Sequence, residues 1–504
     1  MKTKWSKDGI INFVTDVSRA GLYILAGCML FWLNFSSRSI QGGIAVLIIL
    51  FLSIGLGWLL ERLTLHRRYL EWVVLGVCCA LFWLACVGWV AVVPYGMEGD
   101  QAIVWQSAVF ALQGNFSMYG HGGQVFIYPQ QQGLSFLYEM LFRLTGSTSQ
   151  QMIGYVNASM APLTLFFGYQ CVKEIAGTKA AVRFLPLMML CLPYIIYSPY
   201  VYGDIPSISL SFVLLWTILK FCNTMKYRYA VLACGAAALA LICRKNIWIF
   251  LLGALIGLAY QAWQKWNLKH VLFAVCIVLC ASLSMTGIKQ FNSMRSGYPV
   301  SEGMPAVLWL AMGLQYSDYG AGYYNNYSKE VYQKVDFDRE QAITIGWQEV
   351  KDRVKTFGEY PDQCVMFFRE KMKSQWVDPL FESVKFTGTF DEDNMDGVPS
   401  MVLEIYRGEA KETLSQVCSI MMSVVYFFSL MGVAFRYFKK KPIMEDIPLI
   451  VFVGGFLFSI LWEAKARYMF PYFVLLHLYA AYGLTDLTEV IKVRVLKLDG
   501  KRVE

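Results

Sequence analysis

Long apolar runs alternate along this chain with short polar segments that are rich in Lys and Arg. A helix needs about 20 mostly apolar residues to cross the hydrocarbon core of a bilayer, and the runs have about this length. Each run therefore predicts a membrane-spanning helix, and together they predict an all-α polytopic membrane protein. We expect twelve spans, at residues 20–36, 42–60, 70–93, 150–171, 184–202, 205–221, 229–243, 247–263, 270–288, 416–435, 447–463 and 468–487.

The distribution of basic residues predicts the orientation of these spans. The segments expected in the cytoplasm carry 24 Lys and Arg residues, whereas the short segments on the opposite side carry 6. Cytoplasmic loops of membrane proteins are enriched in positive charge. Both termini and the basic loop Lys439–Lys441 are therefore expected in the cytoplasm of a multi-pass cell-membrane protein. The other 14 basic residues lie in segment 289–415, which is too long for this rule to apply.

Composition supports the same class of protein. The chain is 57% hydrophobic and 16% charged, whereas soluble globular proteins contain about 25% charged residues. The net charge of +8 does not indicate a nucleic-acid partner, because the basic residues stand in short clusters between apolar runs. The 13 cysteines form no disulfide framework and no zinc-ligand spacing. An apolar stripe from Ile10 to Val17 predicts a short helix on the cytoplasmic membrane surface. We expect this N-terminal segment not to be cleaved as a signal peptide.

The segment 95–149 is too polar to be a span. It contains two helical patterns, 102–112 and 134–144, around a centre rich in Gly and aromatic residues. The second pattern has an apolar face that predicts a helix along the membrane surface. This face consists of Phe136, Leu137, Met140, Leu141 and Leu144.

The segment 289–415 is predicted to be a soluble insert on the outer side of the membrane. It contains amphipathic patterns at 338–357 and 361–376, the second with a Pro in the first helical turn, where Pro is favoured. The chain would thus comprise an N-terminal transmembrane bundle, 1–288, the insert, and a C-terminal part, 416–504, with further spans and a basic tail.

The third predicted span ends at Pro94, and two carboxylates, Glu98 and Asp100, follow directly. A structural helix cap is one explanation of Asp100, because Asp often caps helices at an interface. A carboxylate just outside the bilayer is also able to accept a proton from an incoming hydroxyl group. Asp100 is therefore the candidate general base.

Further polar residues stand at the same predicted depth. Tyr128-Pro129-Gln130-Gln131 offers an aromatic ring and amide groups suited to a sugar, although a packed loop is an equal alternative. Asp204 lies in a very tight hairpin between two spans, where a carboxylate must be hydrated, paired or functional because charge in the apolar layer is costly.

Two pairs of cations occupy outer hairpins, where positive charge is disfavoured. They are Arg244 with Lys245, and Lys465 with Arg467. Arg binds phosphate with two parallel hydrogen bonds and Lys acts as a point charge, so the pairs predict a shared anionic ligand. The alternative is pairing with the carboxylates Glu463, Asp204 or Glu98.

These motifs together resemble the GT-C superfamily of integral membrane glycosyltransferases. The resemblance rests on the Gly-Asp at Asp100, the stretch from Tyr128 to Leu134, the outer cations, and the motif from Glu463 to Tyr468. It is strongest to the Gram-positive bacterial branch, distantly like protein O-mannosyltransferases and the lipid A aminoarabinose transferase. The chain departs from these relatives by placing two spans before the one that ends near Asp100, whereas relatives often place the acid after the first span.

The resemblance implies a sugar donor linked to polyprenyl phosphate and an inverting displacement on the outer face of the membrane. The acceptor would be an envelope glycan, lipid or protein. In this interpretation Asp100 is the base and Glu98 a helper or metal ligand, so a divalent metal is allowed but not required. Arg244, Lys245, Lys465 and Arg467 would bind the donor phosphate. The substrate-positioning residues would be Tyr128, Gln130, Gln131, Asp204 and Glu463.

Two other classes of function use the same features. A transporter or flippase of a lipid-linked saccharide would also need outer cations and a polar cavity, but no repeated halves are visible and the large insert lies on one side. A non-catalytic assembly subunit would tolerate replacement of Asp100.

Overall fold

The computed structural model describes residues 7–37, 55–62, 68–94, 96–265, 267–388, 398–439 and 442–498. These parts are helical apart from a two-stranded antiparallel hairpin, in which Tyr316 pairs with Ala321, so the all-α class is confirmed. The elements are α1 (Lys7–Ser36), α3 (Arg68–Val92), α4 (Asp100–Leu112), η2 (Ser117–Tyr119), α5 (Gln124–Ile127), η3 (Pro129–Gln131), α6 (Gln132–Thr145), α7 (Gln150–Ala176), α8 (Thr178–Met189), α9 (Leu192–Ile196), α10 (Asp204–Thr224), α11 (Tyr227–Cys243), α12 (Ile247–Lys265), α13 (Leu268–Ser296), α14 (Ala306–Gly313), β1 (Tyr316–Ser317), β2 (Gly320–Ala321), α15 (Tyr327–Lys334), α16 (Arg339–Glu359), α17 (Pro361–Trp376), α18 (Ser383–Thr387), α19 (Ser400–Arg407), α20 (Ala410–Phe438), η5 (Ile443–Asp446), α21 (Ile447–Leu461) and α22 (Ala466–Leu498).

Seven of the described helices are long and apolar enough to cross a membrane, in agreement with a polytopic membrane protein. They belong to α1, α3, α10, α12, α13, α20 and α21, at seven predicted positions. Helices also form at three further predicted positions, as α7, α11 and α22, without being among these seven. Most of the predicted span 42–60 lies outside the described residues. The count of twelve therefore stays a prediction.

The predicted span 184–202 is wrong as a single helix. It is divided into the end of α8 and the short α9, with irregular chain after α9. Pro193 stands in the first turn of α9 and has no backbone N–H, so it cannot donate the hydrogen bond to residue 189 that would continue α8. Pro199 interrupts the chain again. Hydropathy alone missed this break because both pieces are apolar and buried.

The expected separate helix at 10–17 is also not found, because α1 runs without interruption from Lys7 to Ser36. The polar residues around Arg19 do not stop it, since neither Pro nor a left-handed Gly stands there. Arg19 pairs instead with Asp16, one turn away on the same helix.

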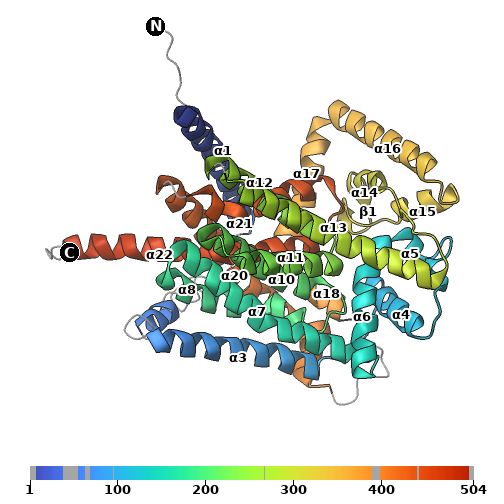
Figure 1. Ribbon diagram of the computed structural model, residues 1–504, viewed down its shortest axis with the longest axis horizontal. Coiled ribbons are helices and arrows are strands. Elements are labelled where there is room, and N and C mark those ends of the chain that lie inside the picture. Colours follow the sequence, from blue (N-terminus) through green and yellow to red (C-terminus); the bar gives the residue numbers. More distant parts are fainter. Residues whose placement is uncertain are drawn as a thin grey trace, which may run out of the picture.

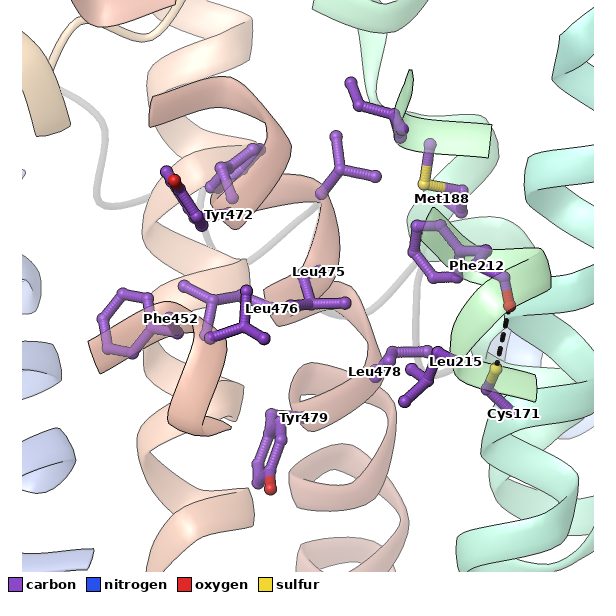
Figure 2. Packing of buried hydrophobic residues seen from close by; sticks show 14 of the residues in the cluster. Cys171, Met188, Phe212, Leu215, Phe452, Tyr472, Leu475, Leu476, Leu478 and Tyr479 are labelled. Atoms are coloured by element: carbon purple, nitrogen blue, oxygen red, sulfur yellow. Dashed lines mark hydrogen bonds between the residues drawn. The ribbon is translucent and has the colours of Figure 1, made fainter. Parts of the chain in front are cut away.

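The core lies between the long helices, with α22 in its centre. Figure 2 shows Leu476 of α22 beside Phe452 of α21, and Leu478 of the same helix beside Leu215 of α10. A helix that is apolar on several faces is expected in such a central position. The beginning of α1 and the end of α22 lie at one end of this bundle, and α4 to α6 lie at the other (Figure 1).

Between α3 and α7 the chain folds into short helices at this second end. The two predicted helices are present as α4 and α6, which pack against each other. The buried face of α6 includes Leu134, Tyr138 and Phe142, whereas the predicted membrane-surface face remains partly or largely exposed. This exposure is compatible with contact to lipid.

The predicted helices of the insert are present as α16 and α17, but the insert is not an isolated body. Met372 and Trp376 at the end of α17 belong to the same hydrophobic core as the long helices. The indole of Trp376 donates a hydrogen bond to the hydroxyl of Ser459, 3.0 Å away in α21. The insert is therefore fixed to the end of α21 and the start of α22.

Candidate functional site

A cavity of about 700 Å³ lies at the end of the bundle where the insert packs on the long helices. Every residue that the sequence singles out for the site lines it, except Asp204, which contacts one of the lining residues. The predicted residues on its wall are Glu98, Asp100, Tyr128, Gln130, Gln131, Arg244, Lys245, Glu463, Lys465 and Arg467. Residues more than 350 positions apart are thus brought to one space.

Asp100 is the first residue of α4, and it does not cap the helix α3 that precedes it. The N-cap position of α4 belongs to Gly99, whose φ of 55° is easily adopted by glycine. The Asp100 carboxylate accepts a hydrogen bond from Nε2 of Gln131 at 3.2 Å, and its side chain is 38% exposed to the cavity. A carboxylate in this position is accessible to a substrate.

Asp204 and Arg244 form a tight, buried pair on a second part of the wall. The Arg244 guanidinium donates to the Asp204 carboxylate at 2.9 Å, and Asp204 is only 1% exposed. The pair depends on close packing between the start of α10 and the end of α11. A Cβ on Gly203 would lie 2.2 Å from the carbonyl oxygen of Cys243, so only glycine allows this approach.

The turn between α21 and α22 carries the third part of the wall. The ammonium of Lys465 lies 2.7 Å from the carboxylate of Glu463. Burial lowers the pKa of Lys465, but Glu463, Tyr468 and Asp100 together raise it by more, so the net pKa is well above its usual value. Lys465 therefore remains charged inside the protein. The turn is held by a backbone hydrogen bond from Ala464 to Gly322 of the insert, at 2.7 Å.

Arg467 follows in the first turn of α22 and is almost completely buried. Its guanidinium lies 3.8 Å from the Asp100 carboxylate, a looser contact than the other two pairs. Its Nε has no hydrogen-bond partner in the described part of the chain. The Oε1 atom of Gln131, also buried on this wall, likewise has none there. Buried polar groups are normally satisfied, so both atoms are suited to contact a bound ligand.

The two arginines lie close together, as the sequence predicts. Their guanidinium carbons are 5.1 Å and 5.2 Å from the centre of the Tyr202 ring, for Arg244 and Arg467 respectively. The two carbons are therefore no more than about 10 Å apart. Both also lie within 5.6 Å of the Tyr468 ring. Cations near aromatic faces are favourably placed, and the rings fix where the two guanidinium groups stand.

Tyr128 aside, the aromatic residues of the wall are the part of the site to which the sequence assigned no role. Tyr202 and Tyr468 stand next to the motif residues in sequence, and this adjacency was the available signal. Phe386 of α18 packs 4.6 Å from the Arg467 guanidinium. The insert adds Tyr324, which lies 5.2 Å from the Lys465 ammonium, and Trp309, which stacks on Trp462. Their contribution depends on long-range folding and has no local pattern.

A metal site was tested among the same residues. Within the described residues, no group of three or more His, Cys, Asp or Glu side chains is close enough to hold a metal ion. Glu98 lines the cavity, but it forms no ion pair in the described part of the chain. The alternative roles of Glu98 therefore stay untested.

No protein-family model and no curated protein matches this chain. Two solved structures are similar to 87% and 88% of it. One is the archaeal oligosaccharyltransferase AglB from Archaeoglobus fulgidus, in complex with an inhibitory peptide and a dolichol-phosphate, with 13% identity and a TM-score of 0.45. The other is an Archaeoglobus fulgidus oligosaccharyltransferase in its apo form, with 14% identity and a TM-score of 0.47. The chain spans 53% of the length of each, and a likeness at this level carries no argument about function.

Proposed function

We propose that this protein is an inverting glycosyltransferase that takes a sugar from a polyprenyl-phosphate donor and transfers it to a cell-envelope acceptor. The observation that carries the proposal is the convergence of one accessible carboxylate, Asp100, with three cations in a single cavity. A base and phosphate-binding cations are the parts that such a displacement needs. The three cations are Arg244, Lys465 and Arg467.

Asp100 has the features of a general base in this reaction. Its carboxylate is partly exposed to the cavity, and the hydrogen bond from Gln131 fixes its orientation. It would accept the proton of the acceptor hydroxyl while the oxygen of that hydroxyl forms a bond to the anomeric carbon. Asp204 is buried and bonded to Arg244, so its role would be to position the arginine.

Arg467 is the cation best placed for the phosphate of the donor. Arg244 and Lys465 are each held by a carboxylate within 2.9 Å, whereas Arg467 is held loosely and has an unused Nε donor. As the glycosidic bond breaks, its electron pair passes to the phosphate, whose growing negative charge a guanidinium stabilises. The leaving group then needs no proton.

An inverting displacement places the base and the leaving group on opposite sides of the anomeric carbon. The sugar must therefore lie between Asp100 and the phosphate bound by Arg467. The 3.8 Å contact between these two side chains is expected to open when the donor binds.

The replacement Asp100→Asn tests the proposal because it keeps the size of the side chain and removes the base. Transfer from polyprenyl-phosphate sugar should fall by about 10²-fold or more, the scale of general base loss. Binding of the donor lipid and folding should persist. The measurement is turnover by the purified protein with donor lipid and an envelope-fraction acceptor.

Asp204→Asn is the matched control and should reduce turnover less, provided that the melting temperature shows a folded protein. Near-normal turnover of Asp100→Asn would remove the base assignment. Unchanged movement of a lipid-linked saccharide across vesicles by that variant, without any transfer, would indicate a flippase.

The proposed orientation has a separate test. Single cysteines introduced at Lys334 in the insert and at Lys440 in the basic loop should differ in labelling by a membrane-impermeant reagent. Position 334 should react in intact cells, and position 440 only after the membrane is opened. Labelling of position 440 from outside would contradict the topology.

A further inference from the structure

We infer that the insert side of the cavity forms a second anion-binding subsite, which takes a phosphate or carboxylate group carried by the acceptor. The inference rests on the proposed function. It names the chemical class of an acceptor that the motifs left open. The residues that carry it are Lys245, Lys329 and Arg339, here called the insert-side cations.

The insert-side cations come from three different elements but line the same cavity as Asp100. Lys245 belongs to the hairpin between α11 and α12, Lys329 to α15 and Arg339 to the start of α16. Arg339 is held in place by Glu302 at 2.7 Å, and it also donates to the carbonyl of Gly303 at 2.8 Å. The start of α16 thus presents a cation to the cavity.

The two lysines differ from every cation on the Asp100 side. No ion pair and no side-chain hydrogen bond of Lys245 or Lys329 is found in the described part of the chain. Burial and the nearby charge of Arg339 both lower the pKa of Lys245, in that order. Glu302 is the carboxylate on this part of the wall, and Arg339 already uses it. The insert side therefore carries an excess of positive charge.

Arg244 and Lys245 are adjacent in the hairpin between α11 and α12, but they have different charged neighbours. Arg244 is bonded to Asp204, whereas its neighbour Lys245 is influenced by Arg339 of the insert. Like charges gathered in a cavity repel each other, and an anionic ligand would relieve this repulsion. The sequence identified Lys245 as a donor-phosphate ligand, but its surroundings favour this second role.

The position of the cluster favours the acceptor over the donor as the source of the anion. The donor phosphate is attached to a lipid, so it is confined to the level of the helix ends that carry Arg244 and Arg467. Lys329 and Arg339 belong to α15 and to the start of α16 in the insert, not to the helix ends that carry Arg244 and Arg467, and α15 lies at the same end of the molecule as α4 to α6 (Figure 1). An acceptor that is soluble, or that extends out from the membrane surface, reaches this wall without entering the lipid.

The test uses the full-length protein in nanodiscs and two soluble probes of equal length, a poly(glycerol phosphate) oligomer and a neutral dextran oligomer. Wild-type protein should bind the anionic probe more tightly, with an affinity that falls as salt rises. Lys329→Glu should weaken this binding by about tenfold, because one attraction becomes a repulsion. Lys334→Glu, on the same helix but outside the cavity lining, should leave it unchanged.

Binding of the donor lipid and of both probes by the same variants distinguishes the possible outcomes. Binding of polyprenyl phosphate should be the same in Lys329→Glu and wild type, whereas Arg467→Gln should weaken it. If Lys329→Glu weakens polyprenyl phosphate binding and spares the glycerol phosphate probe, the anion belongs to the donor and the inference is overturned. Equal binding of the charged and neutral probes by wild-type protein also overturns it. If every variant binds the donor lipid as tightly as wild type, the proposed function is contradicted instead.

Discussion

The two sides of the cavity hold similar numbers of cations but differ in how these are neutralised. On the Asp100 side, Arg244, Lys465 and Arg467 each face a carboxylate. On the insert side, Lys245 and Lys329 face none in the described part of the chain. Counting basic residues in outer loops predicted one uniform anion site, and the structure divides it into a balanced part and a positive part.

The division has a physical basis. The paired cations stand at the ends of buried helices, where an isolated charge is expensive and a carboxylate offsets that cost. The insert-side lysines line the cavity without a carboxylate partner in the described part of the chain. Pairing on the Asp100 side also realises the alternative that the sequence left open, since Glu463 and Asp204 do neutralise outer cations. Among the three paired cations, Arg467 has the longest contact with its carboxylate.

The largest expected effect concerns the buried pair. Arg244→Gln leaves the Asp204 carboxylate buried without a partner, which should lower the free energy of unfolding by about 3–5 kcal/mol. The double variant with Asp204→Asn should recover most of this stability but not the transfer activity. The measurements that check this prediction are the melting temperatures and turnover rates of the wild type, Arg244→Gln and the double variant. Recovery of turnover in the double variant would assign the pair a purely structural role.

Arg467→Gln should act mainly on catalysis. Removing the loosely paired guanidinium should reduce transfer by about 10²-fold, the scale found when one group that stabilises a developing anion is lost. Arg467→Lys keeps the charge but not the planar fork, so it should recover activity in part. A matched control is Arg353→Gln in α16, whose partner is Glu349, away from the cavity. Equal transfer by Arg467→Gln and this control would exclude Arg467 from the reaction.

Lys371 of α17 sharpens the comparison because it is fully buried and has no carboxylate at ion-pair distance in the described residues. Its ammonium donates to the carbonyl of Gly313, and burial lowers the pKa of Lys371 to about 7, a shift that Glu463 partly opposes. Between about pH 7 and pH 10 the unfolded chain binds more protons than the folded protein, so stability should rise with pH in this window and be lowest below it.

Melting temperatures of the wild type and Lys371→Met across this pH range check the prediction. The methionine variant lacks the titrating group, so the rise between pH 7 and pH 10 should shrink. An equal rise in both proteins would show that Lys371 does not lose its proton on folding.

The smallest expected effect is on the stability of Asp100→Asn. The carboxylate is partly exposed and its 3.8 Å contact with Arg467 is looser than the Arg244 pair, so the melting temperature should fall less than in Arg244→Gln. The contrast with Arg244→Gln should be clear in the same thermal assay. A large destabilisation would mean that Asp100 is a structural residue.

The local patterns identified two helices of the insert, α16 and α17, to within a few residues. The pattern at 361–376 coincides with α17, and the motif residues do meet in one cavity. Apolar content could not reveal the break after α8, since a buried interrupted segment has the same hydropathy as a span. It also could not show that Gly99, not Asp100, holds the N-cap position of α4.

The sequence by itself determined the all-α class, the apolar helices and the residue types available for chemistry, because these follow from local periodicity and composition. Only the tertiary structure decided which cation faces which carboxylate. Such pairing depends on distances between segments hundreds of residues apart, as for Asp100 and Arg467. It also requires close helix contacts, such as that of Gly203 with Cys243, and no local pattern encodes these.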